Sequence, residues 1–291
     1  MKTELTQDSI SLFPTPRIPE GEYIEIAQQV SLILSKYTYH DVDHVKRMIQ
    51  EAIKNKSPFS MIRLGDGEGR ILAYPDLINR KELSRSLNVW FGHDGFSDDN
   101  VEQIKIRLIK SIQQADLVGI ATPEMVKKIF PQTILGYALT RFNLLATKES
   151  SITSATIHQL MQLKNIYADI LSNLDFCGLV SSRNLSENLQ KRFNIKEVKC
   201  WLVPGEHKYP GELNNRPHYP EIFYELIDNI SVPYIGAVFL VGAGVLGKIY
   251  CDVIKSKGGI ALDIGSILDA WAEVPSRAFI INHAKAYSLF N

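Results

Sequence analysis

The segment RLGDGEG, residues 63–69, directly follows the apolar run FSMI of residues 59–62. This order predicts a buried strand that ends in a glycine-rich turn. Asp66 and Glu68 are two residues apart, and in extended or tightly turned backbone that spacing points both carboxylates to the same side. The glycines of the segment, including Gly65 and Gly67, would let a ligand approach the backbone closely. We therefore expect a ligand site at the C-terminal end of this strand, where open α/β sheets bind ligands.

The two acids of this segment have no Cys or His beside them. An oxygen-only set of ligands suits Mg²⁺ or Mn²⁺, and both ions usually keep coordination positions open for substrate phosphates. We predict that Asp66 and Glu68 bind the metal and are catalytic, and that Arg63 orients Asp66 or contacts phosphate. The alternative is a solvated turn, because Asp-Gly is a common turn dipeptide.

Apolar runs and helical periodicity alternate along most of the 291-residue chain. The runs predict strands at residues 58–64, 117–121, 176–181, 198–203, 237–241 and 259–263. Helical patterns lie at 21–37, 41–56, 99–115, 134–147, 154–174, 185–193, 219–229 and 245–257. Apolar strands separated by helices are typical of a buried parallel sheet. The prediction is an α/β fold with a mainly parallel, Rossmann-like sheet flanked by helices at residues 57–291, preceded by an N-terminal arm and helical extension at 1–56.

The composition excludes some classes of function and favours others. Lys+Arg and Asp+Glu both number 32, so the net charge is zero and nucleic acid is not an expected partner. The cysteines, Cys177, Cys200 and Cys251, are far apart in apolar surroundings and predict free thiols. The N-terminus lacks the apolar core of a secretory signal, and no run is long enough to span a bilayer. These features predict a cytoplasmic protein, and attachment to the inner face of the membrane through a partner stays open.

A second glycine motif, Gly242-x-Gly244-x-x-Gly247, follows the strand predicted at 237–241 and opens a helix. Asp263 lies at the end of the next predicted strand. Locally this pattern matches the dinucleotide-binding fingerprint, so a nucleotide-dependent oxidoreductase is an alternative. The fingerprint belongs to the first strand of a βαβαβ half, however, and only one clear strand follows here. Gly242 and Gly244 could equally contact a phosphate or allow close packing of the helix on the strand.

Three further segments carry polar or aromatic candidates. Arg183 follows the strand predicted at 176–181 and could bind a pyrophosphate, or it could lie on the surface beside a helix cap. In the Pro/Gly/Asn-rich loop 204–220, Glu206 is the first choice and His207 the second for a general base, although a solvated loop pair is the simpler interpretation. The segment 90–96 (WFGHDGF) combines aromatic residues that could line a sugar pocket with a His and an acid. Buried anchoring is the alternative for its aromatic residues, while the roles of His93 and Asp94 stay open.

The RLGDGE motif resembles the signature of the GT-D fold glycosyltransferases, a bacterial family long described as a domain of unknown function. A second similarity lies near the C-terminus, in the VGAGVLGK segment of residues 241–248 and the GGIALDIGSILDAW segment of residues 258–271. The resemblance spans roughly residues 57–275, with a looser middle part. The first motif is fairly specific, whereas the glycines of the second recur in many α/β proteins.

The resemblance implies a metal-dependent transferase of the hexosyltransferase type. Its donor would be a nucleotide-sugar, most simply a UDP-sugar, and direct displacement would invert the anomeric centre. The acceptor would be a glycan, lipid-linked or protein-linked hydroxyl group in bacterial surface glycan or glycoprotein synthesis. Mn²⁺ or Mg²⁺ would be held by Asp66 and Glu68, and Glu206 would activate the acceptor. A subunit that binds nucleotide-sugars without catalysis is a further alternative.

Overall fold

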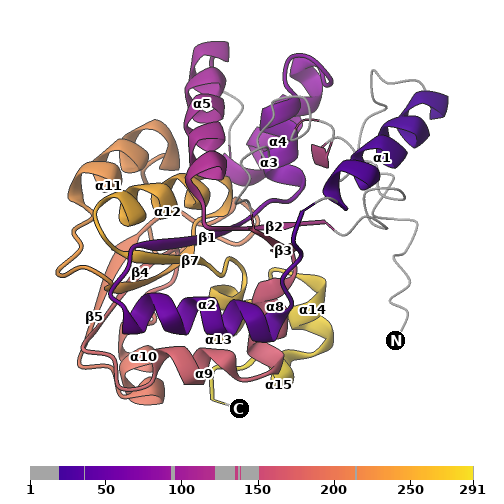
Figure 1. The fold of residues 1–291 in the computed structure, drawn as a ribbon. Helices are drawn as coiled ribbons and strands as arrows, with labels where there is room; N and C mark the ends of the chain where they lie inside the picture. Colours follow the sequence, from indigo (N-terminus) through magenta and orange to yellow (C-terminus); the bar gives the residue numbers. More distant parts are fainter. Residues whose placement is uncertain are drawn as a thin grey trace.

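The computed structural model describes residues 20–35, 37–92, 96–121, 135–136, 138, 151–213 and 215–290. In this part of the chain, seven parallel strands form one sheet in the order β3-β2-β1-β7-β6-β4-β5 (Figure 1). Their bounds are β1 Phe59–Arg63, β2 Leu117–Ile120, β3 Ser151–Ser154, β4 Phe176–Ser181, β5 Glu197–Leu202, β6 Val238–Gly242 and β7 Ile260–Asp263. The predicted α/β class with a parallel sheet is confirmed.

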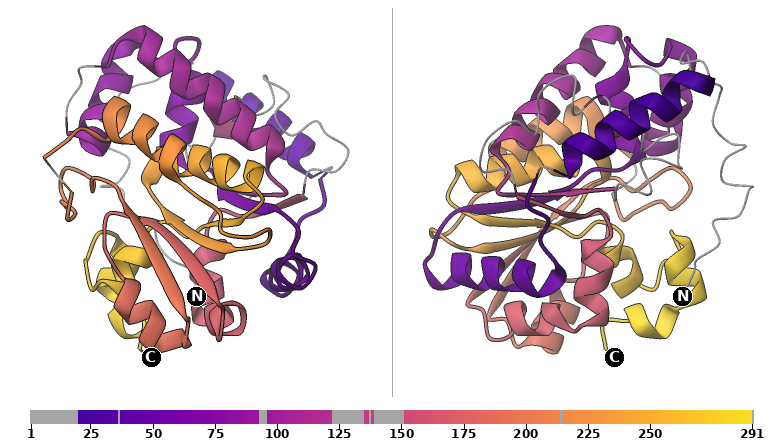
Figure 2. Two further views of the ribbon diagram at one scale, coloured as in Figure 1. Left: turned by 90° about the vertical axis from the view of Figure 1, so that its left-hand side faces the viewer. Right: turned by 45° about the vertical axis from the view of Figure 1, so that its right-hand side comes forward.

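Helices cover both faces of the sheet (Figures 1 and 2). The upper layer in Figure 1 contains α1 Glu20–Leu34, α3 Asp66–Ala73, α4 Arg80–Phe91, α5 Asp98–Gln114, α11 Phe223–Asn229 and α12 Gly247–Ser256. The lower layer contains α2 Val42–Lys54, α8 Ile157–Leu163, α9 Ile166–Leu171, α10 Ser186–Phe193, α13 Ile267–Trp271, α14 Ala278–Asn282 and α15 Ala284–Tyr287. Two short helices, η2 His218–Ile222 and η3 Gly244–Leu246, precede α11 and α12.

Each helical layer closes its own hydrophobic core against the sheet. The upper core contains Leu64, Leu108 and Ile249, and the lower core contains Ile49 and Leu179. Because helices lie on both faces, the interior strand β4 is buried along its whole length, whereas the edge strand β5 has exposed and part-buried positions. This double burial explains why the strands were recognisable as continuous apolar runs.

The six predicted strands are all present within two residues of their expected ends. The sequence did not predict β3, a short edge strand of sequence SITS, because it lacks the apolar run that marked the others. The helix predicted at 154–174 is two helices, α8 and α9, which are separated at Asn165, a residue with a left-handed φ of 55°. The helix α4 was also missed. The helix predicted at 134–147 lies almost entirely outside the described residues.

The N-terminal helices pack on the sheet domain. Helix α2 buries Val45 and Ile49 in the lower core, and α1 buries Ala27 and Val30 in the upper core. The segment predicted as a helical extension therefore supplies part of both layers in its described portion. None of the helices in the described ranges is long and apolar enough to cross a membrane.

The sheet has a topological switch point between β1 and β7, which are neighbours. The chain leaves β1 into the upper layer through α3, and it leaves β7 into the lower layer through α13 (Figure 1). Connections that diverge in this way leave a crevice outside the carboxyl ends of the strands. The RLGDGEG segment begins at this crevice, because β1 ends at Arg63.

Candidate functional site

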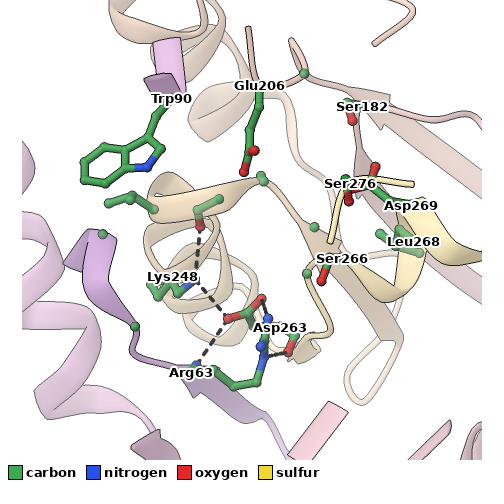
Figure 3. Close-up of a pocket in the computed structure, with 18 of the residues that line it drawn as sticks. Arg63, Trp90, Ser182, Glu206, Lys248, Asp263, Ser266, Leu268, Asp269 and Ser276 are labelled. Carbon is green, nitrogen blue, oxygen red and sulfur yellow. Dashed lines mark hydrogen bonds and ion pairs between the residues drawn. The ribbon is translucent and has the colours of Figure 1, made fainter. Parts of the chain in front are cut away.

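A cavity of about 260 Å³ lies at the carboxyl ends of β1, β4, β6 and β7. It is lined by most of the residues that the sequence singled out: Arg63, Gly65, Asp66, Gly67, Glu68, Glu206, Gly242, Gly244 and Asp263. Trp90, Lys248 and Arg277 also line it, and Figure 3 shows Trp90, Glu206 and Lys248 around the same space. Segments that are far apart in the chain thus meet at the switch point of the sheet.

The floor of this cavity is a chain of buried charges. Arg63 donates from Nε to the backbone oxygen of Asp263 at 2.9 Å, and its Nη2 lies 3.2 Å from Asp263 Oδ1. Lys248 Nζ lies 3.1 Å from Asp263 Oδ2 (Figure 3). It also lies 2.9 Å from Glu68 Oε1. The Asp263, Glu68 and Lys248 side chains are only 2, 6 and 7% exposed. The network therefore ties β1, β7, α12 and α3 together.

The charges of this network stabilise one another. Burial alone would raise the pKa of Asp263, but the neighbouring Arg63 and Lys248 outweigh it and the pKa is lowered. Burial alone would lower the pKa of Lys248, but Asp263 and Glu68 outweigh it and the pKa is raised. Asp263 is therefore a carboxylate and Lys248 an ammonium at neutral pH.

Arg63 is further positioned by the lower layer. Its Nη1 lies 2.9 Å from Nδ1 of His158, which is buried on α8, and donates to the Ala155 backbone oxygen at 3.2 Å. Burial and the charges of Arg63 and Lys248 hold the pKa of His158 well below its usual value. The neutral ring can therefore accept a hydrogen bond from Arg63 without repelling it.

The RLGDGEG segment differs from the expected turn, because α3 begins at Asp66. In a helix, positions two residues apart point about 200° from one another. The expectation of an extended or turned backbone at Asp66 and Glu68 is therefore wrong, although both residues line the same cavity. Gly65 is the N-cap residue, and its backbone N–H donates to Glu68 Oε2 at 2.8 Å. Glu68 thus caps its own helix with one oxygen and pairs with Lys248 through the other.

Asp66 has a different environment from Glu68. It is exposed towards the cavity although protein atoms surround it, and its carboxylate accepts backbone hydrogen bonds at the start of α3. Burial among these atoms and the nearby charge of Glu68 raise the pKa of Asp66, while Arg70 partly opposes the shift. A cation that binds in the cavity would stabilise the ionised form of Asp66 and lower its pKa.

The two acids do not fit a metal equally well. Among the described residues, no three His, Cys, Asp or Glu side chains converge on one point. Mg²⁺ commonly binds through one or two carboxylates together with substrate phosphates. Asp66 fits that mode, because its carboxylate reaches the cavity. Glu68 does not fit it while its oxygens receive Gly65 and Lys248.

The loop after β5 carries Glu206 into the cavity, where it pairs with Arg277. Arg277 Nη1 lies 3.0 Å from Glu206 Oε2, and Nη2 contacts Oε1, so the pair is bidentate. Burial alone would lower the pKa of Arg277, but Glu206, Asp269 and Asp66 outweigh it and the pKa is raised. The proposed base is therefore held by a permanent cation that lines the same cavity.

Two other predicted residues lie outside this cavity. The Arg183 guanidinium holds the loop: it donates to the backbone oxygens of Tyr209, at 2.9 Å, and of Pro210, and pairs with Asp269 at 3.4 Å. The expectation that Arg183 lies at a phosphate site is not supported by this position. His207 is absent from the lining of the first cavity and lines a second one. His93 and Asp94 lie outside the described residues.

The β6–α12 turn brings backbone to the cavity. Gly244 has a left-handed φ of 57°, and a Cβ built there meets no atom within 4 Å. Gly242 is packed tightly instead, because a Cβ would lie 2.7 Å from Leu268 Cδ1. Gly244 is therefore a place for close approach of a ligand, whereas Gly242 permits packing. Asp263 is occupied by the ion network, which disfavours the ribose contact of a dinucleotide site.

The sequence did not indicate the roles of Lys248 and Arg277. Lys248 stands directly after the second glycine motif, so its position was visible but its partners were not. Arg277 lies between β7 and the end of the chain, in a segment without any recognisable motif. The roles of Lys248 and Arg277 follow from contacts between segments that are distant in the sequence.

The fold and the cavity define an α/β protein with a polar ligand site at a switch point of its parallel sheet. Comparison with known families gives a match to the GT-D fold-like domain over residues 40–202. The chain therefore belongs to the family of GT-D-like domains. A comparison with curated protein sequences finds no match.

Two solved structures are similar to this chain. One is described as the highly conserved domain of unknown function 1792, with a distinct glycosyltransferase fold; it is 16% identical, covers 86% of this chain and 85% of its own, and has a TM-score of 0.51. The other is a selenomethionine-substituted structure of the same domain, 14% identical, with the same shares covered and a TM-score of 0.48. At these identities the first similarity establishes the fold alone, which is the glycosyltransferase-like GT-D fold.

Proposed function

We propose that this chain is a hexosyl-type glycosyltransferase that uses a nucleotide-sugar, in the first instance a UDP-sugar, and a hydroxyl acceptor. The observation that carries the proposal is the meeting of three elements in one cavity at the switch point: the first turn of α3 with Asp66, the open glycine turn at Gly244, and the Glu206–Arg277 pair. The GT-D-like fold supports the same function.

The donor diphosphate would lie between the Gly244 turn and Asp66. Gly244 leaves space beside its backbone, and Arg277 offers a cation at the same cavity. Mn²⁺ or Mg²⁺ would be held by Asp66 together with the diphosphate, and when bound it would supply charge neutralisation for the leaving nucleotide. In this account Glu68, which was predicted as a second metal ligand, holds Lys248 and the start of α3.

The transfer step requires a base near the acceptor. The acceptor oxygen attacks the anomeric carbon, the bond from that carbon to the diphosphate oxygen breaks with its electron pair, and the hydroxyl proton passes to Glu206. The product has the inverted configuration. Because Arg277 holds both oxygens of Glu206, we propose that the donor diphosphate draws Arg277 away and frees the base.

The biological setting that we propose rests on the family resemblance. The acceptor would be a glycan, lipid-linked or protein-linked group in bacterial surface glycan or glycoprotein synthesis. The reaction would take place in the cytoplasm or at the inner face of the membrane.

The experiment that tests the function is release of nucleotide from a panel of UDP-, GDP-, dTDP- and CMP-sugars, with and without Mn²⁺. We expect metal-dependent release from one donor class, with at least a 100-fold loss in Asp66→Asn. The Lys164→Met variant, which changes an exposed ion pair with Asp43, is the control and keeps full activity. Nucleotide-sugar binding without release would instead indicate a non-catalytic subunit, and release by Asp66→Asn at the wild-type rate would contradict the metal site.

A further inference from the structure

A second cavity, of about 300 Å³, adjoins the one at the switch point. The two share a wall that contains Trp90, Phe91, Pro204, Gly205, Glu206 and His218. Glu206 is the ionisable acid of this shared wall. A group that binds in the second cavity can therefore reach the same carboxylate that faces the first.

Arg216 and Glu206, which line the second cavity, both have ion-pair partners. Arg216 lies 2.8 Å from Glu225 and 3.4 Å from Glu221, and Glu206 is paired with Arg277. Burial lowers the pKa of His218 to about 3, so this ring is uncharged. A strongly charged ligand would have to displace one of these ion pairs, whereas an uncharged ligand would not.

The walls combine ring faces with polar groups. Trp90 and Phe91 are half-buried at the end of α4, and Phe91 is also held edge-on against His218 at a ring distance of 6.1 Å. His207 and Asn215 line this cavity and not the first, and both carry hydrogen-bonding groups. Flat apolar faces beside hydrogen-bonding side chains suit a pyranose ring, which has an apolar face and an edge of hydroxyl groups.

We propose that the second cavity is the acceptor subsite and takes an uncharged saccharide, with a hydroxyl directed to Glu206 across the shared wall. This inference rests on the proposed transferase function. It gives each cavity a separate substrate: the nucleotide-sugar in the charged cavity and the neutral sugar in the aromatic one. It also explains why Glu206 lies where both cavities meet.

The test uses the full chain in the presence of UDP, with p-nitrophenyl hexosides as probes and saturation-transfer NMR as the readout. Asn215→Trp and Pro210→Trp each fill the second cavity from an exposed position that does not line the first. The matched control is Asn229→Trp, which changes an exposed residue of α11 that lines neither cavity. A thermal shift with the UDP-sugar donor is measured on every variant.

We expect at least one hexoside to bind the wild-type chain and Asn229→Trp, with at least a 10-fold weaker affinity in both cavity-filling variants. The donor shift should be equal in all four proteins, which also establishes that the variants are folded. If no hexoside binds the wild-type chain, or if binding survives both cavity-filling variants, the acceptor subsite is wrong. Failure of the transferase proposal gives a different result, since no nucleotide-sugar would then shift the wild-type chain.

Discussion

Replacing Lys248 by Met removes the ammonium group that joins two buried carboxylates while keeping a side chain of similar length. In the wild-type chain Nζ lies 2.9 Å from Glu68 Oε1 and 3.1 Å from Asp263 Oδ2, and all three side chains are at most 7% exposed. Breaking a buried ion pair by removing one partner costs about 3–5 kcal/mol, because the remaining charge is left uncompensated. The Lys248→Met variant should therefore lose a substantial part of its free energy of unfolding.

The expected shift in Tm follows from the size of the chain. With 291 residues and an unfolding entropy of about 2.1 cal/mol/K per residue, the total is about 0.6 kcal/mol/K. Dividing the loss of about 3–5 kcal/mol by this entropy gives a Tm that is about 5–8 °C lower. Lys164→Met is the matched control, because its partner Asp43 is 58% exposed and Lys164 itself is 50% exposed. An exposed pair of this kind contributes about 1 kcal/mol or less, so this Tm should fall by less than about 2 °C.

The pH dependence separates lost charge from lost packing. The pKa of Asp263 is lowered in the folded chain, so its stabilising contribution is present above the unfolded-state pKa and is lost as pH falls through the folded value. Without Lys248 this carboxyl keeps only Arg63 as a cationic partner, so its pKa rises, and its protonation as pH falls removes part of the excess negative charge. The Tm difference from wild type, measured by calorimetry, should therefore shrink between pH 7 and pH 4. A Tm within about 2 °C of the control, or a difference that does not change with pH, would refute this reasoning.

Three other substitutions test separate parts of the account. Asp66→Asn should raise Tm slightly at neutral pH in thermal melts without ligand, because the raised pKa of Asp66 means that its ionised form destabilises the fold; a clearly lower Tm would contradict this. Arg183→Ala should increase protease cleavage within residues 204–213 and reduce transfer about 10-fold, since it removes the contacts that hold this loop; unchanged cleavage would argue against the role. Gly244→Ala should cost about 1–2 kcal/mol of stability in denaturant titration because of its left-handed φ. It should also weaken donor binding, and a normal donor affinity would place the diphosphate elsewhere.

The sequence was sufficient to predict the α/β layers of the fold and the edge of the sheet at which the cavity lies. Strands such as β4 are buried along their whole length because both faces are covered, so continuous apolar runs identified them. The edge strand β3 has only one isoleucine in four residues, and its pairing with β2 is a tertiary property. Local pattern also failed at residues 66–73, where two of the first four residues are glycines and α3 nevertheless forms. The Gly65–Glu68 cap and the packing of Ile71 and Leu72 in the upper core stabilise this helix.

The candidate site was predicted in its acids, its glycines and Arg63, but not in its other cations. Asp66 and Glu206 were recognisable because each follows a glycine shortly after a predicted strand, at the edge of the sheet where ligands bind. Lys248 and Arg277 become part of the site only through contacts between distant segments, with α12 against β7 and the segment before α14 against the loop after β5. For the same reason Glu68 was predicted as a metal ligand, since its ammonium partner is not a neighbour in sequence. Charge partners of buried acids are thus the part of the site that required coordinates.

The central claim is that the cavity at Asp66 binds a nucleotide-sugar together with a divalent cation. Its most direct test is the thermal stability of the wild-type chain and of Asp66→Asn against UDP-, GDP-, dTDP- and CMP-sugars and NAD(H), each with and without Mn²⁺. A ligand at 100 times its Kd stabilises the native state by about 2.7 kcal/mol, which corresponds to a shift of about 4 °C in this chain. We predict such a shift for one nucleotide-sugar, dependent on Mn²⁺ and absent in Asp66→Asn. A shift with NAD(H) that needs no metal and survives in Asp66→Asn would contradict the account.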